Sequence, residues 1–202
     1  FILVCAIRHL RGDTKKHNSM LVNVSRFTGI QSTVRLLIHD FLSEIVNSIK
    51  GNSSLSIKEA LKNNHINNLY ELFKEEYSTV EFSWKEVQKA LNKAASKIVT
   101  IEVNGSKTAE KIIDYSKENY PGGRSLIAVG GFSLSRGITI EGLSITYFLR
   151  NSFAYDTLMQ MGRWFGYRPR YEDLCRVYMT NDSAGYYRSI SNATEELKEE
   201  FH

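Results

Sequence analysis

The sequence predicts an α/β protein in which helices flank a mostly parallel β-sheet. Two observations support this class. Short apolar runs typical of buried strands recur along the chain, at residues 19–25, 98–103, 125–130, 143–149 and 174–179. Segments with apolar residues at helical spacing lie between most of these runs. Alternating strands and helices favour a parallel sheet with helices on both faces.

The first half of the chain is predicted to be mainly helical. Residues 1–11 carry apolar and small residues on several faces, which indicates a packed helix, and a polar loop separates it from the first strand. Apolar residues recur at helical spacing from Ile30 to Ile49, which predicts a long amphipathic helix. Three more helices are predicted without intervening strands, at residues 56–63, 67–77 and 83–96. We therefore expect a single domain over 1–202 with a helical insertion at about 50–97.

The second half alternates more regularly. A helix is predicted at 107–119, closed by Tyr120-Pro121-Gly122-Gly123, and another at about 155–166 between the last two strands. The final helix should present one apolar face, formed by Tyr186, Ile190, Ala193, Leu197 and Phe201.

Composition limits the classes of function. The chain has 202 residues, a net charge of +4 and a pI of about 9.0, a mild preference for anionic partners. Cys5 and Cys175 lack metal-type spacing, which suggests reduced core residues in a cytoplasmic protein. No apolar run reaches membrane-spanning length, so we expect no membrane partner. The chain starts without Met and ends within a predicted helix, so we interpret it as a fragment of a longer protein.

Arginine and lysine are unevenly distributed. Seven arginines and no lysine lie between Glu118 and Thr180, whereas eleven lysines and no arginine lie from Lys50 through Lys117. Arginine binds phosphate through a rigid, bidentate fork that lysine lacks. The arginine-rich part is therefore predicted to recognise phosphates, and the lysine-rich part to keep the chain soluble.

Two motifs lie in the arginine-rich part. The first is Ser135-Arg136-Gly137-Ile138-Thr139, after the strand at 125–130, and the second is Gly162-Arg163 followed by Arg168. Together with the strand MLVNVSR before a long helix, they resemble the fifth, sixth and fourth motifs in the second RecA-like lobe of superfamily-two helicases. Two departures are clear: Thr139 stands where those helicases often carry Asp, and Arg168 lies two residues later than their second arginine.

Longer stretches resemble one family more closely. GGFSLSRGITIEGL and QMGRWFGYRPRYEDLCR, with AIRHLRG and SMLVNVSRF upstream, are similar to the Z1 domain family of bacterial restriction and phage defence, described as endonuclease-like or helicase-like. The resemblance covers most of the chain and is weakest over 50–97. It implies a RecA-like fold of the P-loop NTPase type.

The resemblance also implies roles for individual residues. Arg163 and Arg168 are candidate arginine fingers, which neutralise charge in the transition state of phosphoryl transfer. The expected nucleotide contacts are Arg136, Gly137, Thr139, Gln160 and Gly162. Ser25, Arg26, Thr28, Ser133 and Ser135 are the expected nucleic-acid contacts, with DNA favoured over RNA. ATP and Mg²⁺ would be bound mainly by a first RecA-like lobe of the same chain outside this sequence, and no metal is expected here.

Alternative interpretations stay open for several of these residues. Arg163 or Arg168 would only brace the fold if it paired with Glu172 or Asp173. Arg136 could belong to a plain turn, and Ser25 or Thr28 could serve as a helix cap. The whole domain could instead be a non-catalytic module that binds nucleic acid or protein, or part of an endonuclease.

Other signals are set aside. Asn104-Gly105-Ser106-Lys107-Thr108 lacks the first glycine and the Gly-Lys-Thr order of a phosphate loop. Asp13, in Asp13-Thr14-Lys15, has no obvious acidic partner for nuclease chemistry. The five histidines lack ligand spacing, and His17 is interpreted as a solvated loop residue.

Overall fold

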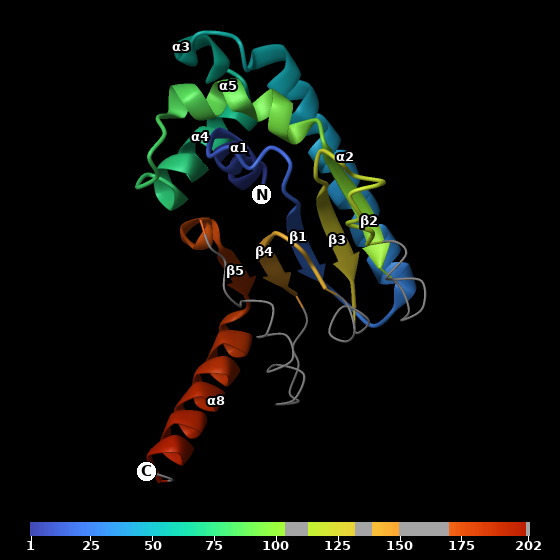
Figure 1. Cartoon of the computed structure of the whole chain (residues 1–202), viewed down its shortest axis with the longest axis vertical. Helices are drawn as coiled ribbons and strands as arrows, with labels where there is room; N and C mark the ends of the chain where they lie inside the picture. The colour runs from blue at the N-terminus through green and yellow to red at the C-terminus, as the bar shows by residue number, and fades with distance from the viewer. Residues whose placement is uncertain (104–112, 132–138, 150–169, 201–202) are drawn as a thin grey trace.

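A parallel β-sheet forms the centre of the protein, as the sequence predicts (Figure 1). The computed structural model describes residues 1–103, 113–131, 139–149 and 170–200. Within these residues the sheet has five strands in the order β2-β3-β1-β4-β5, every neighbouring pair parallel. The strands are β1 (Asn18–Asn23), β2 (Ile98–Val103), β3 (Ser125–Gly130), β4 (Leu143–Phe148) and β5 (Arg176–Met179). The α/β class is therefore confirmed, and it is consistent with a RecA-like fold.

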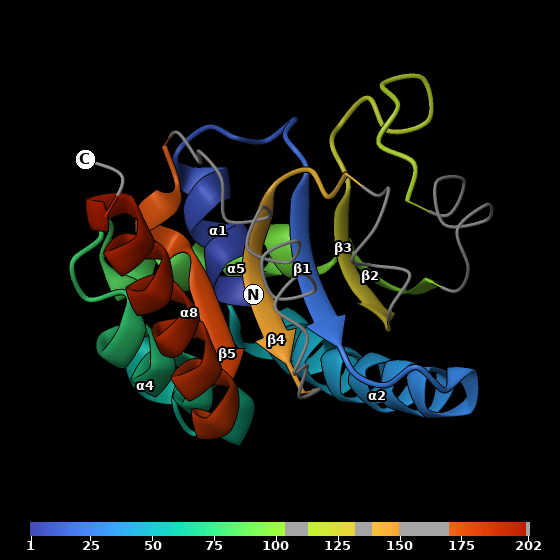
Figure 2. The same cartoon turned by 90° about the horizontal axis from the view of Figure 1, so that it is seen from below.

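Helices from the first half of the chain share one core with one face of this sheet, with α2 along the strands and α5 beyond their amino ends (Figures 1 and 2). They are α1 (Ile2–Leu10), α2 (Thr28–Asn52), α3 (Ile57–Ala60), α4 (Asn64–Glu76) and α5 (Trp84–Ala95). Their buried residues form one apolar core with Val22 of β1, Ile127 of β3 and Ile145 of β4. The helices predicted within 50–97 thus share a core with α1 and the sheet.

A second, smaller core lies on the opposite face of the sheet. Its strand residues include Leu21, Leu126 and Phe148. Leu21 and Val22 lie in different cores because successive side chains of a strand point to opposite faces. Tyr187 and Ile190 of α8 (Asn181–Glu200) pack against this second core. Figure 1 shows that α8 then leads away from the sheet.

Two predictions in the second half were wrong in part. Residues 113–119 are not helical; of the rest of the predicted helix, residues 107–112 lie outside the described residues. The Asp114 carboxylate accepts hydrogen bonds from the Ser116 amide (2.7 Å) and the Asn119 side chain (2.6 Å), and such local bonds favour a turn over a helix. In α8 the packed tyrosine is Tyr187, whereas Tyr186 is exposed.

Arg8 supports the amino ends of the strands from within the core. Its guanidinium donates to the His17 carbonyl (2.9 Å), pairs with Asp13 (3.3 Å) and lies over the Tyr171 ring. Gly142, just before β4, approaches His17 so closely that a Cβ would lie 1.9 Å from the His17 carbonyl oxygen. The upstream stretch AIRHLRG therefore contributes structural contacts at this amino edge, the edge of the sheet where the parallel strands begin.

The structure also bears on membrane association. None of the helices in the described part of the chain is long and apolar enough to cross a bilayer.

Candidate nucleic-acid and nucleotide site

Several predicted site segments directly follow a strand in the sequence, and the parallel strands end at the carboxyl edge of the sheet. β1, β2, β3 and β4 all end there because they run parallel. Open α/β sheets bind their ligands at this edge. The stretches that follow β2, β3 and β4, residues 104–112, 132–138 and 150–169, lie outside the described residues. The part of the candidate site that the structure describes is therefore the loop after β1.

This loop, residues 24–27, passes directly from β1 into the start of α2. The Val24 amide donates to the Gly130 carbonyl (3.0 Å), which extends the pairing with β3 by one residue. Ser25 Oγ accepts a bond from the Phe27 amide (3.3 Å), so Ser25 stabilises the turn. The side chain of Phe27, the residue before α2, makes no capping bond. The amino end of a long uncapped helix carries partial positive charge, which suits a phosphate.

Arg26 and Phe27 are the exposed pair of this loop. The Arg26 guanidinium lies 5.0 Å from the centre of the Phe27 ring, and 58% of Phe27 is exposed. A cation beside an exposed aromatic ring offers one group for a phosphate and one for a base. Arg26 is exposed at the loop after β1, and its assignment as a nucleic-acid contact stays a prediction. Thr28 is the first residue of α2 and is exposed.

Gly131 and Gln31 join the loop after β1 to the loop after β3. A Cβ at Gly131 would lie 2.2 Å from the Ser25 carbonyl oxygen, so only glycine permits this approach. The buried Gln31 side chain, on the first turn of α2, donates from Nε2 to the same carbonyl at 2.6 Å. These contacts fix Ser25 and Arg26 relative to the start of the stretch that contains Ser133, Ser135 and Arg136.

Sequence reasoning missed both Gln31 and Gly131. Gln31 stands one position after the apolar residue Ile30 and carries no motif. Gly131 offered a signal, since it is the second glycine of a Gly-Gly pair that ends a strand.

Of the other predicted site residues, Thr139 alone lies in the described part of the chain. It is exposed and lies in the stretch that leads into the amino end of β4. The remaining predicted residues lie outside the described part of the chain, namely Ser133, Ser135, Arg136, Gly137, Gln160, Gly162, Arg163 and Arg168. Their assignments stay predictions.

Residues set aside in the sequence have structural partners. The Asp13 carboxylate, 8% exposed, is bound by Arg8. His17 is not a solvated residue: only 12% of its side chain is exposed, and its Nδ1 accepts a bond from the Arg124 amide (3.1 Å). Burial raises the pKa of Cys5 to about 12, so its thiol stays protonated. No group of three or more His, Cys, Asp or Glu side chains in the described ranges is arranged to hold a metal ion.

Comparison with known proteins identifies one relationship. Residues 1–202 match the Z1 domain. No curated protein matches the chain, and no solved structure matches it.

Proposed function

This chain belongs to the Z1 domain family, and from that premise we propose that it is the second RecA-like lobe of a helicase-like ATPase that acts on DNA. In this proposal the lobe works in the cytoplasm, in restriction or phage defence. The observation that carries the proposal is the carboxyl edge of a parallel sheet, where Arg26 lies exposed beside the strands that precede both arginine motifs.

The chemistry assigned to this lobe is recognition of phosphate and stabilisation of charge. The described edge fits an anionic ligand, because Arg26 is exposed and the uncapped start of α2 lies next to it. Arg26, with Ser25 and Thr28, would bind the DNA backbone. Ser133 and Ser135 would extend that contact along the loop after β3.

ATP and Mg²⁺ would be held mainly by a first lobe, and the bound nucleotide supplies the phosphoryl group that is transferred. From this lobe, Arg163 and Arg168 would stabilise the negative charge that develops during transfer. Arg136, Gly137, Thr139, Gln160 and Gly162 would contact the nucleotide. A single lobe without a phosphate loop should bind ATP weakly and hydrolyse none.

The decisive experiment measures ATP turnover and ATP binding in a protein that joins this chain to a first RecA-like lobe. Arg163→Ala and Arg168→Ala should each lower DNA-stimulated turnover by about a thousandfold while ATP affinity changes little, because a finger acts on the transition state. Arg163→Lys and Arg168→Lys should restore little, since the planar fork is lost. Lys62→Ala, an exposed residue on the helical side, is the matched control.

Three outcomes would contradict the proposal. If both alanine variants kept full specific activity and only unfolded at a lower temperature, the arginines would brace the fold. Turnover by the isolated chain would contradict the two-lobe mechanism. Metal-dependent DNA cleavage by the isolated chain would favour the endonuclease interpretation.

A further inference from the structure

A row of lysines follows one side of α5 at intervals of four residues. Lys85, Lys89 and Lys93 lie on the helix, and Lys97 follows two residues after its end. All four are exposed, because the opposite side of α5 carries the buried residues Trp84, Val87, Gln88, Ala90, Leu91, Ala94 and Ala95. Like charges four residues apart destabilise a helix, so the row lowers the stability of α5. A solvated surface of mixed charge would not have this effect.

Three acidic groups near the row in the sequence or in space are already engaged elsewhere. Glu86 accepts bonds from the Ser83 amide (2.8 Å) and hydroxyl (2.7 Å), which caps α5. Glu81 is held by Arg11, and Asp13 is held by Arg8. In the described part of the chain none of the four lysines forms a salt bridge. Their positive charge is therefore not neutralised within the part of the protein that the structure describes.

A fifth lysine extends the row toward the sheet. Lys16 lines a small hollow together with Lys93, Lys97 and His9. Burial, with the charges of Lys93 and Lys97, lowers the pKa of His9, so at neutral pH this imidazole adds no charge of its own. Lys89 and Lys93 also line a surface depression together with Ser53, Ser54, Asn92 and Ser96.

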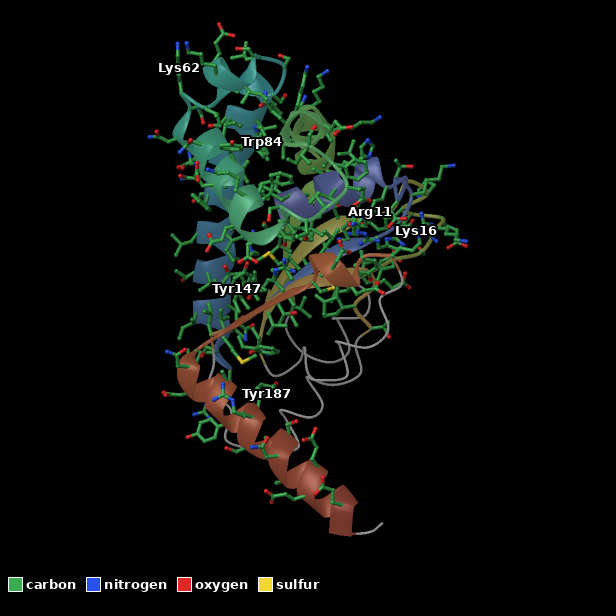
Figure 3. All side chains as sticks on the ribbon, turned by 90° about the vertical axis from the view of Figure 1, so that its left-hand side faces the viewer. Arg11, Lys16, Lys62, Trp84, Tyr147 and Tyr187 are labelled. Carbon is green, nitrogen blue, oxygen red and sulfur yellow. The ribbon has the colours of Figure 1, made fainter. Side chains whose placement is uncertain are left out.

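The row lies at the opposite end of the sheet from the candidate site. Figure 1 shows α5 beyond the amino ends of the strands, whose arrowheads point away from it. Figure 3 shows Lys16 on the side of the molecule away from Lys62 and α2. A ligand on this row would therefore leave the carboxyl edge free.

We propose that Lys16, Lys85, Lys89, Lys93 and Lys97 form a second nucleic-acid site that binds the phosphates of a single strand without reading its sequence. Four helical residues rise about 6 Å, close to the spacing of successive phosphates along an extended strand. Lysine is a compact charge on a flexible stem, so it tolerates variation in the position of each phosphate. Such contacts give affinity without sequence specificity.

Two other anionic partners fit the row less well. Helices that bind a membrane surface insert an apolar face, but the apolar face of α5 is buried in the core. An acidic protein partner would need an apolar or aromatic anchor at the centre of the interface. None of the exposed large apolar side chains in the described ranges belongs to α5. A linear polyanion needs neither feature.

The test measures binding of a fluorescent oligothymidylate by anisotropy over a range of salt concentrations. The test variant combines Lys85→Gln, Lys89→Gln and Lys93→Gln. The matched control, Lys58→Gln, Lys62→Gln and Lys117→Gln, removes the same charge from other exposed positions. The test variant should bind about tenfold more weakly, and its slope of log affinity against log salt should fall by about 2. The control should bind like the original protein.

The comparison with Arg26→Ala separates this site from the one at the carboxyl edge. If the two sites bind separate strands, the lysine changes should cause at least as large a loss of affinity in the Arg26→Ala background as in the original protein, because the carboxyl-edge site then contributes less to the measured binding. Thermal unfolding should show that the lysine variant is folded. Unchanged affinity and slope, an equal loss in the control, or binding of phosphatidylserine vesicles without binding of the oligonucleotide would each overturn the proposal.

Discussion

Arg11 holds Asp173 through both oxygens of its carboxylate, at 2.8 Å from Nη1 and 2.7 Å from Nη2. The same guanidinium donates to Glu81 from Nε and Nη2, both at 2.8 Å, and to the Arg170 carbonyl at 2.9 Å. The contact ties the end of α1 to the residues before β5. Asp173 is also one of the two residues, with Glu172, that we considered as a structural partner of Arg163 or Arg168. In the described part of the chain, the arginine that binds Asp173 is Arg11.

The Arg11 contacts predict a dependence of stability on acid. Hydrogen bonds from Arg11 lower the pKa of Glu81 to about 2 and also lower the pKa of Asp173. A carboxylate with a lowered folded-state pKa stabilises the protein above its unfolded-state pKa and loses that effect as the pH falls through the folded-state value. The free energy of unfolding should therefore fall between about pH 4.5 and pH 2.

The test is Asp173→Asn combined with Glu81→Gln, followed by urea unfolding at several pH values. At pH 7 the variant should lose about 1 kcal/mol, since both carboxylates are half-exposed and solvent weakens such pairs. Its acid dependence should be shallower than that of the original protein. Glu71→Gln, which breaks the exposed pair with Lys74, is the control and should change neither quantity. Identical acid profiles would contradict the assignment.

Gly131 should tolerate no side chain. Gly131→Ala would place a Cβ 2.2 Å from the Ser25 carbonyl oxygen and 2.6 Å from Gln31 Nε2, which forces the two loops apart. The expected destabilisation is about 1–3 kcal/mol, measured by urea unfolding. Gly51→Ala, inside α2 with open space around it, is the control and should be stabilising by about 1 kcal/mol. Equal stability for both variants would refute the close packing of the loops.

Arg26 should contribute to nucleic-acid binding and not to basal ATP turnover. Arg26→Ala should reduce the slope of log affinity against log salt by about 0.7 for a single strand, because one phosphate contact is lost. Affinity should fall for all sequences alike, since a backbone contact carries no sequence information. Anisotropy titrations with two unrelated oligonucleotides test both points. A loss confined to one sequence, or no change in slope, would exclude a phosphate contact.

If the lysine row binds a nucleic acid, Lys89 should lower the stability of the protein and raise its affinity for the oligonucleotide. Lys89→Gln removes repulsion with both Lys85 and Lys93 and should be stabilising by about 0.5–1 kcal/mol. The same change should weaken oligonucleotide binding. Thermal unfolding and anisotropy on one preparation measure both effects. A destabilised variant, or one with unchanged affinity, would argue that the row is only a solvated surface.

Local patterns in the sequence were enough to predict most elements and the class of the fold. Runs of apolar residues marked every strand of the described sheet, and helical spacing marked α2, α4 and α5, because these signals are local. Local reasoning failed where a short-range polar contact decided the conformation, as at Asp114. Helical spacing alone also could not show which side of α8 packs against the sheet. The prediction therefore named Tyr186, whereas Tyr187 is the tyrosine that packs against the core.

The contacts between residues far apart in the sequence could not be predicted in this way. The strand order placed the loop after β1 against Gly131, and Arg11 met Asp173 across 162 positions of the chain. These contacts depend on how strands pair and which face each helix covers, and no local pattern of residue types encodes that. The spacing of the α5 lysines was visible in the sequence. Their exposure became clear only when the core took the opposite side of the helix and nearby carboxylates found other partners.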